Sequence, residues 1–360
     1  MAQQRSDLHS SGAAAATDFI EMHGWELPAV FTDVASEYRS AISEAAVHDA
    51  SYMGRLKAAG TDALDLLNRL STNEVVDLEP GQGAPTILTT DKGRILDVII
   101  VINAGEHILL LTSPGMQGPV IAFLDKYTIM EDLTLEDVSS ATATLAVWGP
   151  ESQEHLAKAA SADLSSLQPY HSLAAEVGGR PVRLISYSFA DLPGYYLISS
   201  VEDASAVWQG LADAGITPMG AEASETARIA QGMPAHGSEM SDDFNPLEAG
   251  LIGAIDFTKG CYIGQEVIAR LDTYKKVQKY LVKLAFAEGS TVAPGALLTH
   301  EGKPVGKVTS VATDPSNGRN IGLGYVRTVQ AVVGMRLDLE AGSGWAEIIS
   351  LPQMFGPERS

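Results

Sequence analysis

Cysteine is almost absent from this chain, since Cys261 is the only one among 360 residues. A single thiol excludes an internal disulfide framework. It also excludes a self-contained zinc or iron–sulfur site, because such sites normally use about four protein ligands with cysteine prominent among them. We therefore expect no permanently bound metal, and the cysteine content fits a reducing, cytoplasmic location.

Basic residues are scarce as well. The chain has 24 Lys and Arg against 45 Asp and Glu, which gives a formal net charge of -21. Nucleic acids and anionic membranes attract proteins through basic surfaces. We therefore expect neither as a partner, and an anionic ligand needs a local basic pocket.

Long uninterrupted apolar runs are also missing. The most apolar stretch, residues 95–112, is interrupted by Asp97, Asn103, Glu106 and His107. This pattern predicts two strands around an Asn-Ala-Gly-Glu turn and not a membrane-spanning helix. The alanine run at 13–16 is too short for a signal-peptide core, so residues 1–16 are expected to form a mobile tail.

The composition that is present indicates a well-cored globular protein. Hydrophobic residues make up 45% of the chain, and 360 residues are enough for two or three domains. Residues 55–60 predict a short strand that ends at Gly60, and residues 61–70 predict an amphipathic helix after it. Residues 145–149 predict a second strand that ends in glycine, followed by a helix that begins at Pro150. This similarity predicts an internal repeat of α+β subdomains, with coincidence as the alternative because strand-glycine-helix units are common.

The pattern changes beyond residue 275. Predicted strands at 280–286, 305–311 and 321–326 alternate with Gly, Pro and Asn turns, which is typical of a small all-β domain. The predicted division is a tail at 1–16, a first α+β subdomain at 17–144, a second at 145–275 and a β-barrel at 276–360.

The only cysteine lies in a distinctive octapeptide. Residues 259–266 are Lys-Gly-Cys-Tyr-Ile-Gly-Gln-Glu. The glycines predict a tight turn, after which Gln265 begins a predicted helix. Cys261 would lie just ahead of that helix and near Lys259, and both features favour the reactive thiolate. The alternative is a small buried hydrophobic side chain, as most lone cysteines are.

This octapeptide resembles, at every fixed position, the signature of the YgfZ family of folate-binding proteins. That family belongs to the superfamily of the glycine-cleavage T-protein, an aminomethyltransferase, and includes a branch that assists iron–sulfur cluster assembly. The resemblance implies a three-domain cloverleaf with two α+β folate-binding subdomains and a C-terminal β-barrel. It also implies tetrahydrofolate or a derivative as the cofactor, and a role linked to one-carbon metabolism.

Further segments are similar to the superfamily: residues 49–54, 90–101, 226–232, 245–251, 306–310 and 324–326. Asp97 occupies the place of a catalytic aspartate. A carboxylate in so apolar a strand must find hydrogen-bond donors or lose its charge, and a reduced pterin offers such donors. The alternative is a strand-end aspartate that faces solvent.

Arg228 occupies the place of a folate-binding arginine. Its guanidinium matches a carboxylate of the folate tail in bidentate geometry, whereas an exposed helix position is the ordinary alternative. The resemblance also assigns Lys259, in the signature, and Tyr325, in the segment similar to the closing barrel, to folate binding.

One segment departs from the superfamily. T-proteins have a Thr-Gly-Glu-Asp-Gly segment whose acidic residue helps to bind the pterin, whereas residues 188–194 here are Ser-Phe-Ala-Asp-Leu-Pro-Gly. Only Asp191 could substitute for that acidic residue.

Two functions therefore remain. In the first, the protein binds tetrahydrofolate and Cys261 assists assembly or repair of iron–sulfur clusters, with client or assembly proteins as partners. In the second, it is a tetrahydrofolate-dependent aminomethyltransferase or demethylase, in which Asp97 acts on a small amine donor bound beside folate. The complete cysteine signature and the missing acidic loop favour the first.

Overall fold

The computed structural model describes residues 4–5, 16, 18–190, 192–340 and 344–355. The chain separates into two compact units, each built from several segments. The first comprises 1–68, 74–86 and 98–224, and the second comprises 69–73, 87–97 and 225–360. The predicted tail lies outside the described residues except for Gln4, Arg5 and Ala16.

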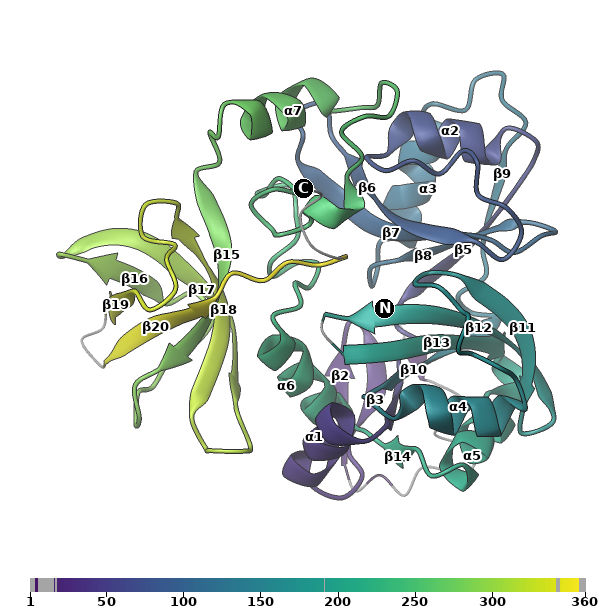
Figure 1. Cartoon of the computed structure of the whole chain (residues 1–360), viewed down its shortest axis with the longest axis horizontal. Coiled ribbons are helices and arrows are strands. Elements are labelled where there is room, and N and C mark those ends of the chain that lie inside the picture. Colours follow the sequence, from purple (N-terminus) through teal and green to yellow (C-terminus); the bar gives the residue numbers. More distant parts are fainter. Residues whose placement is uncertain (1–3, 6–15, 17, 191, 341–343, 356–360) are drawn as a thin grey trace. The chain divides into compact units, whose positions relative to one another are not determined.

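The first unit contains a sheet of strand order β11-β12-β13-β10-β4-β14. Its strands are β4 (Ala46–Asp49), β10 (Thr142–Trp148), β11 (Ser172–Val177), β12 (Arg180–Phe189), β13 (Leu192–Ser200) and β14 (Thr217–Pro218). Helices α4 (Ser152–Ala160) and α5 (Ala204–Asp213) cover one face, as Figure 1 shows. Leu156 of α4 and Trp208 of α5 are buried in one apolar core with Leu145 and Leu197 of the sheet.

Two further sheets have the strand orders β1-β3-β2 and β6-β7-β8-β5-β9. Their strands are β1 (Gln4–Arg5), β2 (Asp18–Met22), β3 (Trp25–Val30), β5 (Gly54–Ala59), β6 (Gly83–Thr89), β7 (Ile95–Asn103), β8 (Ile108–Thr112) and β9 (Thr134–Asp137). Further helices are α1 (Val34–Ser43), α2 (Ala63–Leu70), α3 (Gln117–Asp125), α6 (Ala221–Gln231) and the 3₁₀ helix η2 (Val201–Asp203). Residues 87–89 of β6, 95–97 of β7 and 225–231 of α6 belong to the second unit. The predicted pair of strands in residues 95–112 is confirmed as β7 and β8.

Two glycines make the sharp exits from strand to helix that the sequence predicts. Gly60 follows β5 with φ +125°, and Gly149 follows β10 with φ +123°. A Cβ atom would lie 2.0 Å from the carbonyl oxygen of Asp132 at the first position and 2.3 Å from that of Glu44 at the second. Only glycine fits such a backbone and such an approach, so the strand-glycine-helix form is confirmed at both places.

The second unit contains a closed barrel of order β15-β18-β17-β16-β19-β20, drawn in green to yellow in Figure 1. Its strands are β15 (Lys279–Phe286), β16 (Leu297–His300), β17 (Lys303–Thr313), β18 (Asn320–Arg327), β19 (Arg336–Leu339) and β20 (Trp345–Ser350). Alternate residues such as Val282, Leu284 and Phe286 fill its core. The 3₁₀ helix η3 (Ile252–Ala254) and helix α7 (Gln265–Thr273) precede the barrel.

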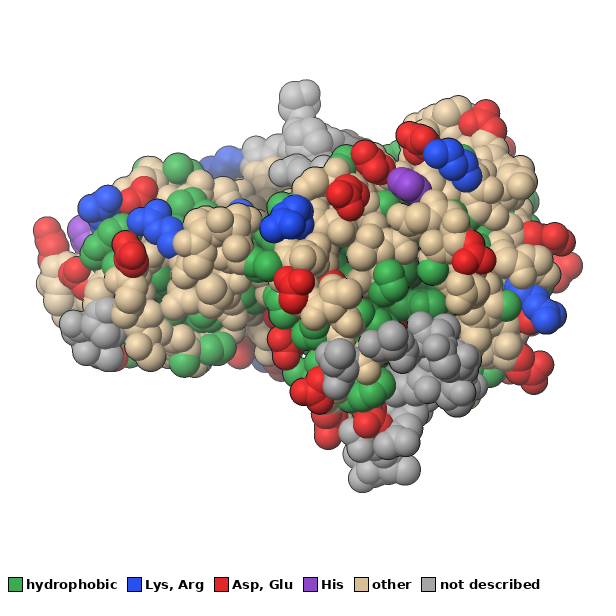
Figure 2. All heavy atoms as spheres, turned by 90° about the horizontal axis from the view of Figure 1, so that it is seen from below, with side chains coloured by type: hydrophobic (Ala, Val, Ile, Leu, Met, Phe, Trp, Pro, Cys, Tyr) green, Lys and Arg blue, Asp and Glu red, His purple; other side chains and the backbone are tan. Residues whose placement is uncertain are grey.

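The fold is therefore α+β with a C-terminal barrel, as the sequence predicts. The finer division at residues 17–144, 145–275 and 276–360 stays a prediction. On the face in Figure 2, Asp and Glu side chains are scattered among the others and are not gathered in one patch. In the part of the chain that the structure describes, no helix is long and apolar enough to cross a membrane.

Candidate functional site

Asp97 lies in strand β7, at a position with no exposed surface. It shares its strand face with Ile95 and Ile99, which are 1% and 0% exposed, because side chains two residues apart point the same way. The solvent-facing alternative for Asp97 is therefore wrong. A carboxylate at such a position is held only where donors meet it, so the site suits a ligand or protein group that donates hydrogen bonds.

Asp97 belongs to the second unit, and so do Arg228, Lys259, Cys261 and Tyr325. Residues that lie far apart in the sequence are thus brought into one compact unit. Asp191, the remaining predicted site residue, lies outside the described residues. Its role in binding folate stays a prediction.

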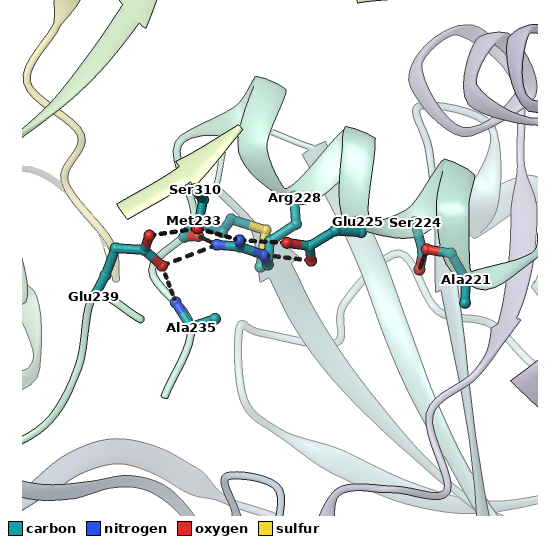
Figure 3. Close-up of polar contacts among 8 residues, drawn as sticks. All are labelled: Ala221, Ser224, Glu225, Arg228, Met233, Ala235, Glu239 and Ser310. Carbon is teal, nitrogen blue, oxygen red and sulfur yellow. Dashed lines mark hydrogen bonds and ion pairs between the residues drawn. The ribbon is translucent and has the colours of Figure 1, made fainter. Parts of the chain in front are cut away.

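Arg228 of α6 uses all five of its guanidinium N–H groups within the protein (Figure 3). Nε and Nη2 donate to the two carboxylate oxygens of Glu225, at 2.7 and 2.6 Å, and Nη1 donates to Glu239 at 3.2 Å. The remaining bonds go to the carbonyl of Met233 and, at 3.0 Å, to the hydroxyl of Ser310. Folate could bind Arg228 only by displacing one of these acceptors, so this geometry favours a structural role.

The charges of two carboxylates stabilise the cation of Arg228, whose side chain is only 13% exposed. Burial by itself would lower the pKa of Arg228, but hydrogen bonds and charge from Glu225 and Glu239 more than offset it, and the pKa is raised. The Glu239 carboxylate has no exposed surface, whereas that of Glu225 is 40% exposed. The cation is therefore balanced on its buried side by Glu239.

Tyr325 of β18 is also committed to protein contacts. Its hydroxyl donates to the backbone carbonyl of Glu239 at 2.7 Å. Its ring stacks on Phe244 with centroids 4.0 Å apart, and the ammonium of Lys279 lies 4.2 Å from the Phe244 centroid. Burial, and then the charges of Glu239 and Glu248, raise the pKa of Tyr325, so the hydroxyl remains a donor. Its assignment to folate binding stays a prediction.

Lys259 anchors the cysteine segment to a distant part of the chain. Its ammonium donates to the carbonyl oxygens of Ser71 at 2.9 Å and Asn73 at 2.7 Å, and it lies 5.6 Å from the ring centroid of Tyr262. Burial raises the pKa of Tyr262 to about 12. The positive charge of Lys259 therefore satisfies backbone acceptors, a role that the sequence does not predict.

The signature glycine at 264 permits close docking onto the β6–β7 hairpin. It has φ +83°, and a Cβ atom there would lie 2.6 Å from the carbonyl oxygen of Thr90. The hydroxyl of Thr89 donates to the carbonyl of Ile263 at 2.6 Å. Helix α7 begins at Gln265, which confirms the predicted turn and helix start.

Cys261 is exposed on this anchored segment. The alternative of a small buried hydrophobic side chain is therefore wrong. Among the described residues, no group of three or more His, Cys, Asp or Glu side chains is arranged to hold a metal ion. The prediction that no metal is permanently bound stays a prediction.

Aromatic side chains gather where the sequence lacks the acidic loop. Trp148 and Phe189 stack with centroids 4.3 Å apart, and Tyr187 and Tyr196 pack beside Phe189 at 4.7 and 5.4 Å. Gly194 makes room for this packing, since a Cβ atom there would lie 2.5 Å from the Phe189 ring. Sequence analysis missed this cluster, although Tyr187, Phe189, Tyr195 and Tyr196 all lie within one short stretch.

Replacing Lys259 by Met is expected to lower the free energy of unfolding by about 2–3 kcal/mol, because two buried carbonyls lose a charged donor. Urea titration of the purified protein measures this loss. The matched control is Lys275→Met, whose side chain is 82% exposed and pairs with Asp272 at 3.0 Å, so its change should stay within about 0.5 kcal/mol. Unchanged stability with lost folate affinity would instead favour the ligand role predicted from the sequence.

Comparison with protein families gives two matches that together span most of the chain. Residues 8–259 match a family described as the GCVT N-terminal domain. Residues 279–353 match the glycine cleavage T-protein C-terminal barrel domain. The second match covers the strands of the barrel from β15 to β20.

Similar proteins span nearly the whole chain. An aminomethyltransferase of Bacillus velezensis is 30% identical over 350 residues, covering 95% of each chain. A putative chloroplastic transferase of Arabidopsis thaliana is 35% identical over 290 residues, covering 80% of this chain and 66% of that protein. The crystal structure of glycine cleavage system aminomethyltransferase T from Bartonella henselae has a TM-score of 0.87, with 22% identity and 99% of each chain covered. That last likeness bears on the fold alone.

Proposed function

The chain belongs to the glycine cleavage T-protein family, and from this membership we propose that it is a tetrahydrofolate-dependent one-carbon transferase. It would take an aminomethyl or methyl group from a small amine donor. The observation that carries the proposal is the match to an aminomethyltransferase over 95% of both chains. This favours the function that the sequence analysis placed second.

The buried carboxylate of Asp97 supports the same proposal. Transfer of a one-carbon unit from an amine to a folate nitrogen passes through a species with developing positive charge on the carbon and its nitrogen. A preorganised carboxylate in a water-poor site stabilises such a charge far better than water does. In this proposal Asp97 is the catalytic residue, and it also orients the folate ring by accepting its N–H groups.

The cysteine signature supports a second candidate, assistance in iron–sulfur cluster assembly or repair. Cys261 is exposed, and its segment is fixed by Lys259 and Gly264. A presented thiol on an anchored segment suits transient contact with another protein. The relatives described above have transferase names, so this candidate takes second place here.

One pair of variants separates the two functions. We expect Cys261→Ser to keep tetrahydrofolate-dependent loss of a methyl or aminomethyl group from small amines within about twofold of the unmodified protein, because Cys261 is exposed and the proposed transfer gives its thiol no role. The measurement is turnover over a panel of small amines, with the folate product identified by mass spectrometry.

The same variant is then expressed in cells that lack the endogenous homologue, and the activities of iron–sulfur enzymes are measured. Full rescue by Cys261→Ser supports the transferase proposal. Loss of those activities, together with no turnover by the unmodified purified protein on any amine, would reject it in favour of cluster assembly.

A further inference from the structure

Glu239 forms hydrogen bonds with several segments of the second unit. The sequence alone assigned it no role. Its Oε1 accepts from the Ser310 hydroxyl of β17 at 2.6 Å. Its Oε2 accepts from Arg228 of α6 at 3.2 Å and from the backbone N–H of Ala235 at 3.0 Å. Its backbone carbonyl accepts from Tyr325 of β18 at 2.7 Å. Figure 3 shows the side-chain part of this network.

The buried carboxylate of Glu239 is stable because hydrogen bonds and an ion pair compensate its charge. The carboxylate is wholly buried, and a buried charge is stable only when it is paired and hydrogen-bonded. Both carboxylate oxygens accept hydrogen bonds, and the backbone N–H donates to Ala235 at 2.9 Å. Glu239 therefore fixes the conformation of the segment that begins at Ala235, here called segment 235–244.

Segment 235–244 lies along the residues that lead into Asp97. Two hydrogen bonds join them: Ile95 N donates to the Phe244 carbonyl at 3.0 Å, and Arg94 Nη1 donates to the Asp243 carbonyl at 3.1 Å. These bonds hold the backbone at Ile95, two residues before Asp97, and the side chain of Arg94. The position of Asp97 on β7 therefore depends on a segment that Glu239 holds in place.

We propose that Glu239 is a positioning residue for Asp97. It links helix α6 and two barrel strands to segment 235–244, and that segment sets the backbone from which the Asp97 carboxylate projects. The inference rests on the proposed function only in taking Asp97 as the folate contact. Catalytic groups misplaced by about 1 Å can lose about 100-fold in rate, so a residue that fixes this backbone has a measurable effect on the site.

Three variants separate the parts of this network. Glu239→Ala removes every side-chain bond. Glu239→Gln removes the charge and can keep the bonds, because its amide oxygen can accept from Arg228 and Ala235 while its NH₂ group donates to Ser310. Glu225→Gln is the matched control, since it alters the more exposed partner of the same arginine. In the described part of the chain, the hydrogen bonds of the Glu225 carboxylate go to Arg228 and not to segment 235–244.

Amide hydrogen exchange of the ligand-free protein, read by mass spectrometry well below the unfolding temperature, tests the positioning directly. Glu239→Ala is expected to speed exchange of peptides that contain Ile95 and residues 235–244 about tenfold, because their shared hydrogen bonds open more often. Glu239→Gln should restore most of the protection, and Glu225→Gln should leave it unchanged. If Glu239→Ala does not fold, Ser310→Ala provides the same test with an expected change of about threefold. Unchanged exchange at Ile95 would overturn the inference.

A double-mutant cycle on tetrahydrofolate affinity tests the link to Asp97. Glu239→Ala should weaken binding about tenfold in the unmodified background and less than about twofold when Asp97 is already Asn, since residues that act through one site are not additive. Additive losses would contradict the positioning role. If the unmodified protein does not bind tetrahydrofolate, the proposed function fails, and the exchange measurement still decides whether Glu239 positions the strand.

Discussion

Asp97→Asn is expected to weaken tetrahydrofolate binding about 10- to 100-fold, because a buried charged hydrogen bond contributes about 1.5–3 kcal/mol. Turnover should fall further, by about 100- to 1000-fold, since the carboxylate also stabilises charge that develops during transfer. The side chain of Asn has nearly the same shape, so the strand should keep its packing. Calorimetric titration measures the affinity, and single-turnover kinetics measure the transfer step.

The matched control for this substitution is Asp91→Asn. Asp91 is exposed in the turn between β6 and β7, only six residues away, so the same chemical change there should alter affinity by less than about twofold. An Asp97→Asn protein that binds tetrahydrofolate and turns over as well as the unmodified protein would remove Asp97 from the mechanism.

Arg228→Ala is expected to lower the free energy of unfolding by about 3–5 kcal/mol, because it leaves the buried Glu239 carboxylate without its cation. Arg228→Lys should recover only part of that loss, since one ammonium cannot replace five planar donors. Denaturant titration with two independent probes measures both variants, and the second probe checks that unfolding remains a single transition.

An exposed arginine serves as the control for this loss. Arg336 is 63% exposed and pairs with Glu347 at 2.9 Å, so Arg336→Ala should change stability by no more than about 1 kcal/mol. If Arg228→Ala unfolds at the same denaturant concentration as the unmodified protein but no longer binds folate, the arginine contacts the ligand tail, as the sequence resemblance implies.

Local patterns in the sequence predict much of the fold. Alternating apolar residues predict β15, β17 and β18, and Gly60 and Gly149 mark two sharp strand exits. These features are predictable because the physical cause lies within a few residues of the feature itself. The burial of Asp97 is predictable for the same reason, since its apolar neighbours require a buried strand.

The partners of charged residues in the site could not be predicted in this way. Lys259 donates hydrogen bonds to the carbonyls of Ser71 and Asn73, almost 190 residues earlier in the chain. Every residue has a backbone carbonyl, so the sequence does not indicate which carbonyls will accept these bonds. Glu239 pairs with Arg228 and Ser310 across different elements, so no helical or strand spacing records the network. Resemblance to a family can point to Arg228, but only the folded chain shows that its donors are already used.

The segmented make-up of the second unit has a consequence for how the protein is made. Residues 87–97, which include Asp97, leave the ribosome long before residues 225–360, with which they form one compact unit. At about 5–20 residues per second, the intervening chain takes on the order of ten seconds to synthesise. During that interval segment 235–244, which Glu239 holds in place, has not yet been synthesised, so the apolar end of the β6–β7 hairpin cannot pack against it. Until then, the strand that later presents Asp97 is therefore open to aggregation and to chaperone binding.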